Sequence, residues 1–253
     1  MIATPLRTVL YVDDEPDIRE IVQIALSLTE TLTVHTAKSG EQALALAREL
    51  RPDLVLLDVM MPGLDGPGTL SRMRRDPITA PIPVIFMTAK AMPKEVALLK
   101  EMGAVGVIAK PFDPMRLSTQ VASLWEGRPA ETPIPVAVAG NSNLQRQVTK
   151  IGERFLQRTR DQAVRLRSLI EAIKPGDVTE IEEVKSLAHR IRGSGSTFGF
   201  ADVSECAGEI EHLVDGLKQP GAKPGMAVDP RIRRRLAECT QRLARAVEAA
   251  ATP

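Results

Sequence analysis

The chain has 253 residues, a length that suits two domains with a core each. Its 33 lysines and arginines nearly balance 32 acidic residues, and the formal charge of +1 argues against general binding to nucleic acids. No apolar run approaches the roughly 18 residues that span a membrane, and acidic residues appear before a signal-peptide core could form, so we expect a cytoplasmic protein without membrane insertion. The two cysteines, Cys206 and Cys239, lie in helical patterns and are expected to be reduced.

Five short apolar runs in the first half of the chain alternate with helical patterns. The runs cover residues 8–12, 32–36, 53–57, 83–87 and 105–109. The helical patterns cover residues 17–28, 40–50, 68–75, 93–102 and 114–125. Strands that alternate with helices predict an α/β domain, a parallel sheet with helices on both faces. Right-handed crossovers then give a flavodoxin-like (βα)5 order, a doubly wound sheet.

Polar residues stand where four of these runs end. They are Asp13 with Asp14, then Asp58, Thr88 and Lys110. The carboxyl ends of parallel strands share one edge of a sheet, so we expect these side chains to gather there. Three neighbouring carboxylates repel one another, and Mg²⁺, which prefers hard oxygen ligands, relieves that repulsion. The lysine and the hydroxyl complete a pocket suited to positioning a phosphoryl group and neutralising its charge.

This arrangement, over residues 6–126, resembles the receiver domain of two-component response regulators. The resemblance implies that Asp58 accepts a phosphoryl group, that Lys110 pairs with it, and that Thr88 moves its hydroxyl onto it. It also implies a cis peptide bond between Lys110 and Pro111, a form that proline tolerates.

The same resemblance implies a magnesium site. Asp14 and Asp58 are expected to bind the metal directly, with the backbone carbonyl of Met60 as a third ligand. Asp13 is expected to act on the metal through a water molecule.

Three positions bear on the switch and on the lifetime of the phosphate. Receivers usually carry an aromatic residue three positions before the lysine, and here that residue is Val107, so we expect no aromatic side-chain switch on the fifth strand. In the family, the residues that correspond to Met60 and Lys90 flank the path of the attacking water. Neither an apolar nor a cationic side chain assists that attack, so we expect slow hydrolysis of the phosphate on Asp58.

A segment rich in proline and glycine separates the two halves of the chain. It predicts a linker over residues 127–141, between a receiver at 1–126 and a second domain at 142–253. The second domain shows helical patterns only, at residues 143–174, 179–196, 202–217 and 230–250. Helices with short connections predict an all-α bundle of four helices.

A histidine lies on the polar side of the second of these helices. At about 100° per residue, His189 lies opposite an apolar stripe formed by Ile181, Val184, Leu187, Ala188 and Ile191. Two glycines follow, Gly193 and Gly195, although each weakens a helix by about 1 kcal/mol against alanine. We interpret them as a bare surface that admits a partner close to an exposed imidazole. Arg192 is placed to offset the charge of a phosphoryl group on His189.

This segment resembles the His-x-x-Lys-Gly-Ser signature of histidine phosphotransfer (HPt) domains, with Arg192 at the lysine position. The resemblance covers residues 142–253 and implies that His189 is phosphorylated. A receiver joined to an HPt domain is expected to work as a phosphorelay intermediate that uses Mg²⁺. Its expected partners are sensor histidine kinases, other HPt domains and other receivers, and contacts between its two domains or between two copies stay open. No pattern resembles an ATP-binding module, so we expect no ATP-dependent kinase activity.

Two other functions stay open at this point. In one, the helical domain only docks partners under the control of receiver phosphorylation, and His189 carries no phosphate. In the other, DNA is bound by a cluster of arginines: Arg231, Arg233, Arg234 and Arg235. No helix-turn-helix pattern accompanies the cluster and only 3% of the residues are aromatic, so we expect a solvated helix face instead. A solvated helix face is also expected for His212, which lies among Glu205, Glu209 and Glu211.

Overall fold

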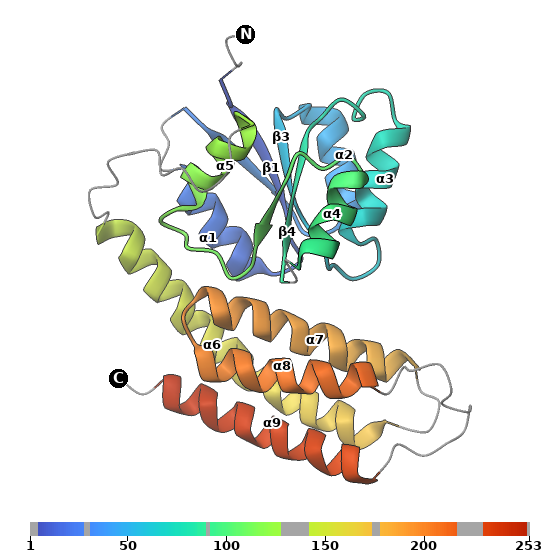
Figure 1. Ribbon diagram of the computed structural model, residues 1–253. Coiled ribbons are helices and arrows are strands. Elements are labelled where there is room, and N and C mark those ends of the chain that lie inside the picture. The colour runs from blue at the N-terminus through green and yellow to red at the C-terminus, as the bar shows by residue number, and fades with distance from the viewer. Residues whose placement is uncertain are drawn as a thin grey trace. The chain divides into compact units, whose positions relative to one another are not determined.

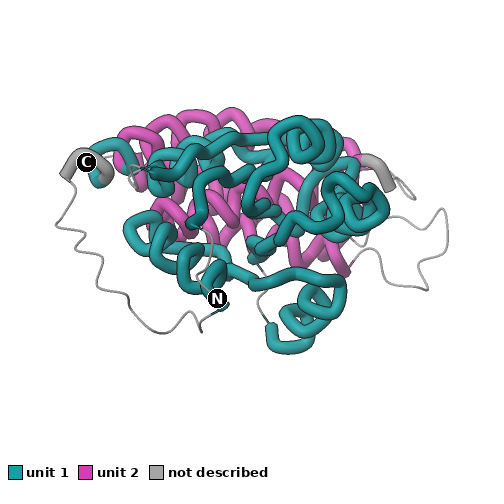
Figure 2. Tube along the Cα trace, turned by 90° about the horizontal axis from the view of Figure 1, so that it is seen from above, with its two compact units in different colours: residues 1–148 teal, residues 149–253 magenta. Residues whose placement is uncertain are grey.

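The computed structural model describes residues 5–27, 31–89, 92–127, 142–173, 178–216 and 230–251. The chain divides into two compact units, residues 1–148 and residues 149–253 (Figure 2). Apart from Gly127, the predicted linker at 127–141 lies outside the described residues, so the predicted boundaries at 126 and 142 stay predictions. Among the described residues, no helix combines the length and the apolar character that a membrane crossing requires.

The first unit is a parallel sheet with helices on both faces (Figure 1). Its strands are β1 (Thr8–Val12), β2 (Thr33–Ala37), β3 (Leu54–Asp58), β4 (Val84–Thr88) and β5 (Gly106–Ala109), in the spatial order β2-β1-β3-β4-β5. Its helices are α1 (Pro16–Ser27), α2 (Gly40–Leu50), α3 (Gly66–Arg75), α4 (Pro93–Glu101) and α5 (Leu117–Trp125). Helices α1 and α5 cover one face, and α2, α3 and α4 cover the other (Figure 1). The predicted flavodoxin-like sheet is confirmed.

The core of this unit lies on both sides of the central strands. Every residue of β3 and β4 is buried, as expected for parallel strands that are covered on both faces. On the face of α2 and α3, the side chains of Leu57 and Phe86 pack with Leu70 and Met73 of α3. The packed sheet therefore fixes the positions of the residues that follow the carboxyl ends of its strands.

Two helix starts differ from the prediction. Helix α3 begins at Gly66 rather than at residue 68, because the side chain of Asp65 accepts a hydrogen bond from the backbone N–H of Gly68 at 2.8 Å. Pro67 in the first turn fits the same start. Helix α5 begins at Leu117, since residues 114–116 form turns instead.

The second unit consists, in its described part, of helices packed around one apolar core (Figure 1). They are α6 (Ser142–Ala172, its residues up to Val148 grouped with the first unit), α7 (Val178–Thr197), α8 (Ala201–Gly216) and α9 (Pro230–Ala250). Each helix contributes a fully buried side chain, among them Leu166, Val184, Ile210 and Leu243. The predicted helical bundle is confirmed.

A tight turn joins α7 to α8. Gly199 adopts a φ of +82°, a left-handed conformation that glycine takes without strain. Around it, the backbone N–H of Phe200 donates to the carbonyl of Gly195 at 2.8 Å. The turn brings α8 alongside α7, which matters for the histidine on α7.

Candidate functional site

The polar residues at the strand ends meet at the carboxyl edge of the sheet. Asp13 follows β1, Asp58 ends β3, Thr88 ends β4 and Lys110 follows β5. One carboxylate oxygen from each of Asp13, Asp14 and Asp58 lies within 4.8 Å of the others. The sequence therefore located this cluster correctly, although the catalytic roles stay predictions.

Lys110 links two of the carboxylates. Its Nζ lies 2.8 Å from Oδ2 of Asp13 and 3.0 Å from Oδ1 of Asp58, and all three side chains are nearly buried. Burial alone would lower the pKa of Lys110, but the charges of Asp13 and Asp58 and their hydrogen bonds raise it above its usual value. The ammonium group is therefore charged at any working pH. The backbone bond from Lys110 to Pro111 is cis, as the resemblance implied.

Asp13 is held by three donors. Its Oδ1 accepts the backbone N–H of Glu15 at 2.8 Å, and its Oδ2 accepts Lys110 and the hydroxyl of Tyr11, the latter at 2.5 Å. A carboxylate offers about four acceptor positions, so roughly one position is left on Asp13. That single position fits contact with a metal through water better than direct coordination. Sequence reasoning missed Tyr11, although its spacing of two residues before Asp13 on a strand places both on one face.

The cluster has the chemistry that Mg²⁺ requires. Its three carboxylates are hard oxygen donors close enough to share one cation, and Asp13 and Asp58 are buried. Positive charge at this position would relieve their mutual repulsion beyond what Lys110 supplies. The backbone carbonyl of Met60 as a further ligand stays a prediction.

A glycine lets the chain pass close beneath Asp58. A Cβ atom on Gly66 would lie 2.3 Å from the backbone oxygen of Asp58, so no other residue fits there without moving the backbone. The backbone N–H of Gly66 donates to the carbonyl of Val59 at 3.0 Å. The hydrogen bond thus links the start of α3 to the loop that follows Asp58 and contains Met60.

The switch positions lie where the sequence placed them. Thr88 is buried at the end of β4, and its backbone carbonyl accepts the N–H of Lys110 at 2.7 Å. Val107 is a half-buried residue of β5 opposite Phe86 of β4. Lys90 lies outside the described residues.

A second polar cluster joins α7 to α8. The Nδ1 atom of His189 lies 3.0 Å from Oε1 of Glu211, and the guanidinium group of Arg192 donates to Oε2 of Glu211 at 2.9 Å. The stem of Arg192 crosses α8 at Gly208, whose absent side chain leaves room for it. Glu211 is buried, whereas its neighbour His212 is exposed as predicted.

The electrostatics keep Glu211 ionised. Burial alone would raise the pKa of its carboxyl group, but hydrogen bonds from His189 and Arg192, and their charges, lower it to about 2. An ionised carboxylate only accepts hydrogen bonds, so the proton in the contact belongs to Nδ1 of His189. When the imidazole is neutral, its lone pair is then on Nε2.

Two expectations for this helix need correction. The predicted apolar stripe of α7 is buried, but the side chain of His189 is only 12% exposed because α8 and Glu211 cover one side of it. Gly195 does not form a bare surface, since a Cβ there would lie 3.3 Å from the backbone nitrogen of Ser204 on α8. Gly193 has nothing within 4 Å of its added Cβ, so it alone of the two fits the predicted open surface.

The cysteines are buried, and two arginines of the cluster have partners within the second unit. Cys206 and Cys239 are free thiols, and burial raises the pKa of Cys239 to about 11, which makes it a poor nucleophile. Arg233 donates to the backbone carbonyl of Ile173 at 2.5 Å near the end of α6, and Arg234 pairs with Glu238. Because these contacts engage Arg233 and Arg234, fewer side chains of the arginine cluster are available to bind DNA than the sequence alone suggests.

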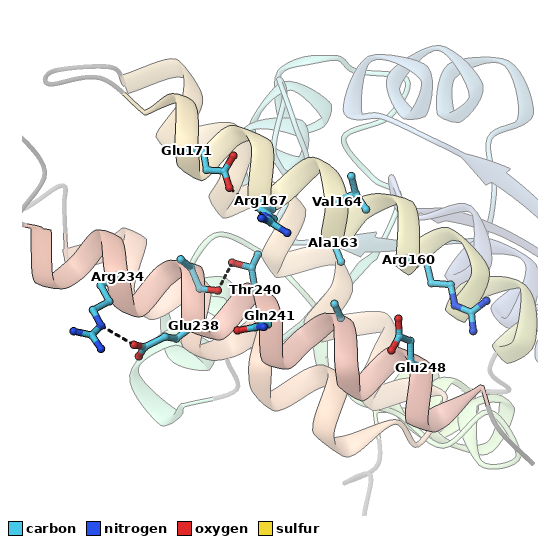
Figure 3. A pocket seen from close by; sticks show the side chains of 12 residues that line it. Arg160, Ala163, Val164, Arg167, Glu171, Arg234, Glu238, Thr240, Gln241 and Glu248 are labelled. Carbon is cyan, nitrogen blue, oxygen red and sulfur yellow. Dashed lines mark hydrogen bonds and ion pairs between the residues drawn. The ribbon is translucent and has the colours of Figure 1, made fainter.

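A groove lies between α6 and α9, and His189 does not line it (Figure 3). Its volume is about 490 Å³, and small side chains such as Ala163 and Ala244 line it together with the exposed Val164. Its charged lining residues balance, three arginines against three glutamates: Arg160, Arg167, Arg234, Glu171, Glu238 and Glu248. The groove therefore favours no ligand of one charge.

Comparison with known proteins places both units in families. Residues 9–122 match the response regulator receiver domain, and residues 151–248 match the Hpt domain. The chain therefore belongs to the two-component signalling proteins, as a receiver domain followed by an Hpt domain. Neither family is an ATP-dependent kinase.

Several relatives match half of the chain or more. The phosphate regulon transcriptional regulatory protein PhoB of Pseudomonas aeruginosa is 37% identical over 135 residues, which cover 53% of this chain and 58% of that protein. A probable cyclic di-GMP phosphodiesterase of Vibrio cholerae is 32% identical over 190 residues, 73% of this chain and 42% of that protein. The chain thus spans about half of the length of these relatives. Among solved structures, the receiver domain of the putative response regulator NarL from Mycobacterium tuberculosis is 32% identical, over 49% of this chain and 100% of that one, with a TM-score of 0.45.

Proposed function

We propose that the chain is a phosphorelay intermediate. Asp58 accepts a phosphoryl group from a partner phosphohistidine, and His189 passes phosphoryl groups to or from aspartates of receiver domains. The hydrogen bond from His189 to buried Glu211 supports this proposal most, because it prepares one imidazole nitrogen as a nucleophile. A histidine that served only as part of a docking surface would not need a buried, ionised partner.

At Asp58, the reaction is an in-line displacement at phosphorus. A carboxylate oxygen forms the new P–O bond while the P–N bond of the partner phosphohistidine breaks, and its electron pair returns to the imidazole nitrogen. Lys110, 3.0 Å from Oδ1 of Asp58, offsets the charge that the phosphoryl group brings, and Thr88 turns its hydroxyl toward it. When bound by Asp14, Asp58 and the carbonyl of Met60, Mg²⁺ supplies further positive charge at the phosphoryl oxygens.

At His189, the nucleophile is Nε2, since Nδ1 carries the proton that Glu211 accepts. Transfer from an aspartyl phosphate forms an N–P bond at Nε2 and breaks the P–O bond, whose electron pair stays on the aspartate. The imidazole ring becomes positively charged, and the carboxylate of Glu211 offsets that charge. Arg192 holds Glu211 in place, and its predicted contact with the phosphoryl group would require it to leave this ion pair.

The partners in this proposal are a sensor histidine kinase or another Hpt domain as donor, and receiver domains as acceptors. The relatives' regulatory and phosphodiesterase activities belong to those proteins and do not enter the proposal.

Phosphorylation by a small phosphodonor tests the first half of the proposal. We expect the purified chain, incubated with Mg²⁺ and acetyl phosphate, to form an acyl phosphate on Asp58. The Asp58→Asn variant should lose the label, whereas Asp202→Asn, which changes an exposed aspartate of α8, should keep it. Labelling of Asp58→Asn at the parent level would contradict the assignment.

A further inference from the structure

The single tyrosine of the chain points into the acidic cluster. Tyr11 is fully buried on strand β1, beside Leu56 of β3 and Thr36 of β2. Its hydroxyl donates to Oδ2 of Asp13 at 2.5 Å, a short distance typical of a bond to a charged acceptor. Burial, followed by the charges of Asp13 and Asp58, raises the pKa of Tyr11 well above its usual value. The hydroxyl therefore remains a donor throughout the working pH range.

This bond uses acceptor capacity that a cation would also use. Oδ2 of Asp13 is shared between Tyr11 and Lys110, and Oδ1 is occupied by the backbone N–H of Glu15. Three hydrogen-bond donors fix the orientation of the Asp13 carboxylate, and two of them suffice if the third is removed. The hydroxyl of Tyr11 is thus not needed to orient Asp13, but it withdraws negative charge from it.

We propose that Tyr11, acting through Asp13, limits the affinity of the acidic cluster for Mg²⁺. The inference rests on the proposed function, since it assumes that the cluster binds this ion. Without the ion, the hydroxyl offsets part of the buried charge of Asp13 and keeps its Oδ2 shared with Lys110. With the ion, the hydroxyl and the water that links the ion to Asp13 draw on the negative charge of the same carboxylate, so the tyrosine keeps the metal exchangeable.

A purely structural role makes a different prediction. A buried tyrosine hydroxyl needs some hydrogen-bond partner, and Asp13 would serve only to satisfy it. Loss of the hydroxyl would then lower stability by the same amount with and without Mg²⁺. The two roles therefore separate in a measurement of metal affinity.

The test is Mg²⁺ binding to the full chain and to its Tyr11→Phe variant by isothermal titration calorimetry. Phenylalanine keeps the ring and removes only the hydroxyl. We expect the variant to bind Mg²⁺ about fivefold more tightly, the lower end of usual coupling between competing interactions. Its melting temperature should fall without Mg²⁺ and approach that of the parent at saturating Mg²⁺. Equal affinities within about twofold, or weaker binding by the variant, would overturn the inference.

The NMR resonance of Tyr11 gives a second readout, and the Asp13→Asn variant is its control. Because the chain has one tyrosine, labelling with [¹³Cζ]tyrosine gives a single resonance that reports on this hydroxyl. We expect it to shift when Mg²⁺ is added and to have shifted already in the Asp13→Asn variant, which removes the charge it faces. A resonance that does not respond to Mg²⁺ counts against the competition. A parent chain that binds no Mg²⁺ would instead overturn the magnesium site of the proposed function.

Discussion

Glu211 on α8 accepts a hydrogen bond from Nδ1 of His189 on α7, at 3.0 Å, and is held from its other side by Arg192. The carboxylate is buried, yet the hydrogen bonds and charges of these two partners keep it ionised. One helix thus fixes the tautomer of a histidine on another helix. The bond makes Glu211 the residue whose change is most informative for the second unit.

The Glu211→Gln variant should slow phosphoryl transfer to His189. The amide oxygen can still accept from Nδ1, but it no longer offsets the charge that develops on the imidazole. We expect a rate about tenfold lower, which corresponds to about 1.4 kcal/mol in the barrier. The measurement is the rate of transfer from a phosphorylated receiver partner, with Glu205→Gln, at an exposed position of the same helix, as the control. An unchanged rate in Glu211→Gln would mean that the carboxylate has no part in the chemistry.

The same residue gives a dependence of stability on pH. Its pKa in the folded protein is about 2, below the ordinary value of 4.5. A carboxyl group whose pKa is lowered by folding stabilises the protein fully above its unfolded pKa, and this contribution disappears as pH falls through the folded pKa. We therefore expect the difference in free energy of unfolding between the parent and Glu211→Gln to shrink between pH 4.5 and pH 2. Urea denaturation across this range measures it, and a constant difference would be inconsistent with the ion pairs.

The two glycines of α7 should respond in opposite ways to alanine. Gly193→Ala meets open space and should gain about 1 kcal/mol of stability, the usual helix preference for alanine. Gly195→Ala places its Cβ 3.3 Å from the backbone of Ser204 and should lose stability. If the bare surface at Gly193 admits a partner, phosphoryl transfer to His189 should slow in Gly193→Ala, although this variant is the more stable one. Transfer at the parent rate in Gly193→Ala would show that Gly193 does not serve to admit a partner.

The phosphate on Asp58 should be long-lived. Met60 is apolar and Lys90 cationic, so neither orients a water molecule for attack. In a His189→Gln background, which prevents onward transfer, the double variant Met60→Asn and Lys90→Glu should lose phosphate faster, because an amide and a carboxylate there can orient the attacking water. The measurement is the decay of the aspartyl phosphate, and equal decay in the two chains would show that these residues do not control it.

The receiver site was largely accessible from the sequence because its residues stand at the ends of apolar strands. In a parallel sheet such positions share one edge, so Asp13, Asp58 and Lys110 could be brought together without coordinates. Tyr11 was not recognised, because a tyrosine inside an apolar strand pattern resembles any other core residue. Only the position of its hydroxyl, 2.5 Å from Asp13, distinguishes it.

The helical site was less accessible because it depends on packing between helices. The helical period of the apolar residues placed His189 outside the apolar stripe of α7. No sequence pattern tells which neighbouring helix covers the side of α7 that carries His189. Glu211 follows other acids on an amphipathic helix, and nothing in that pattern distinguished it as a partner of His189. The tight turn at Gly199 and the close packing at Gly195 decide that it meets His189 instead.

The most direct test of the relay is phosphotransfer profiling of the full chain against purified kinases and receivers of its host. We expect label to pass through the parent chain and through His212→Gln, which changes an exposed histidine next to Glu211 on α8. The His189→Gln variant should accept label on Asp58 and pass none to a downstream receiver. Undiminished transfer through His189→Gln would contradict the relay and support a bundle that only docks partners.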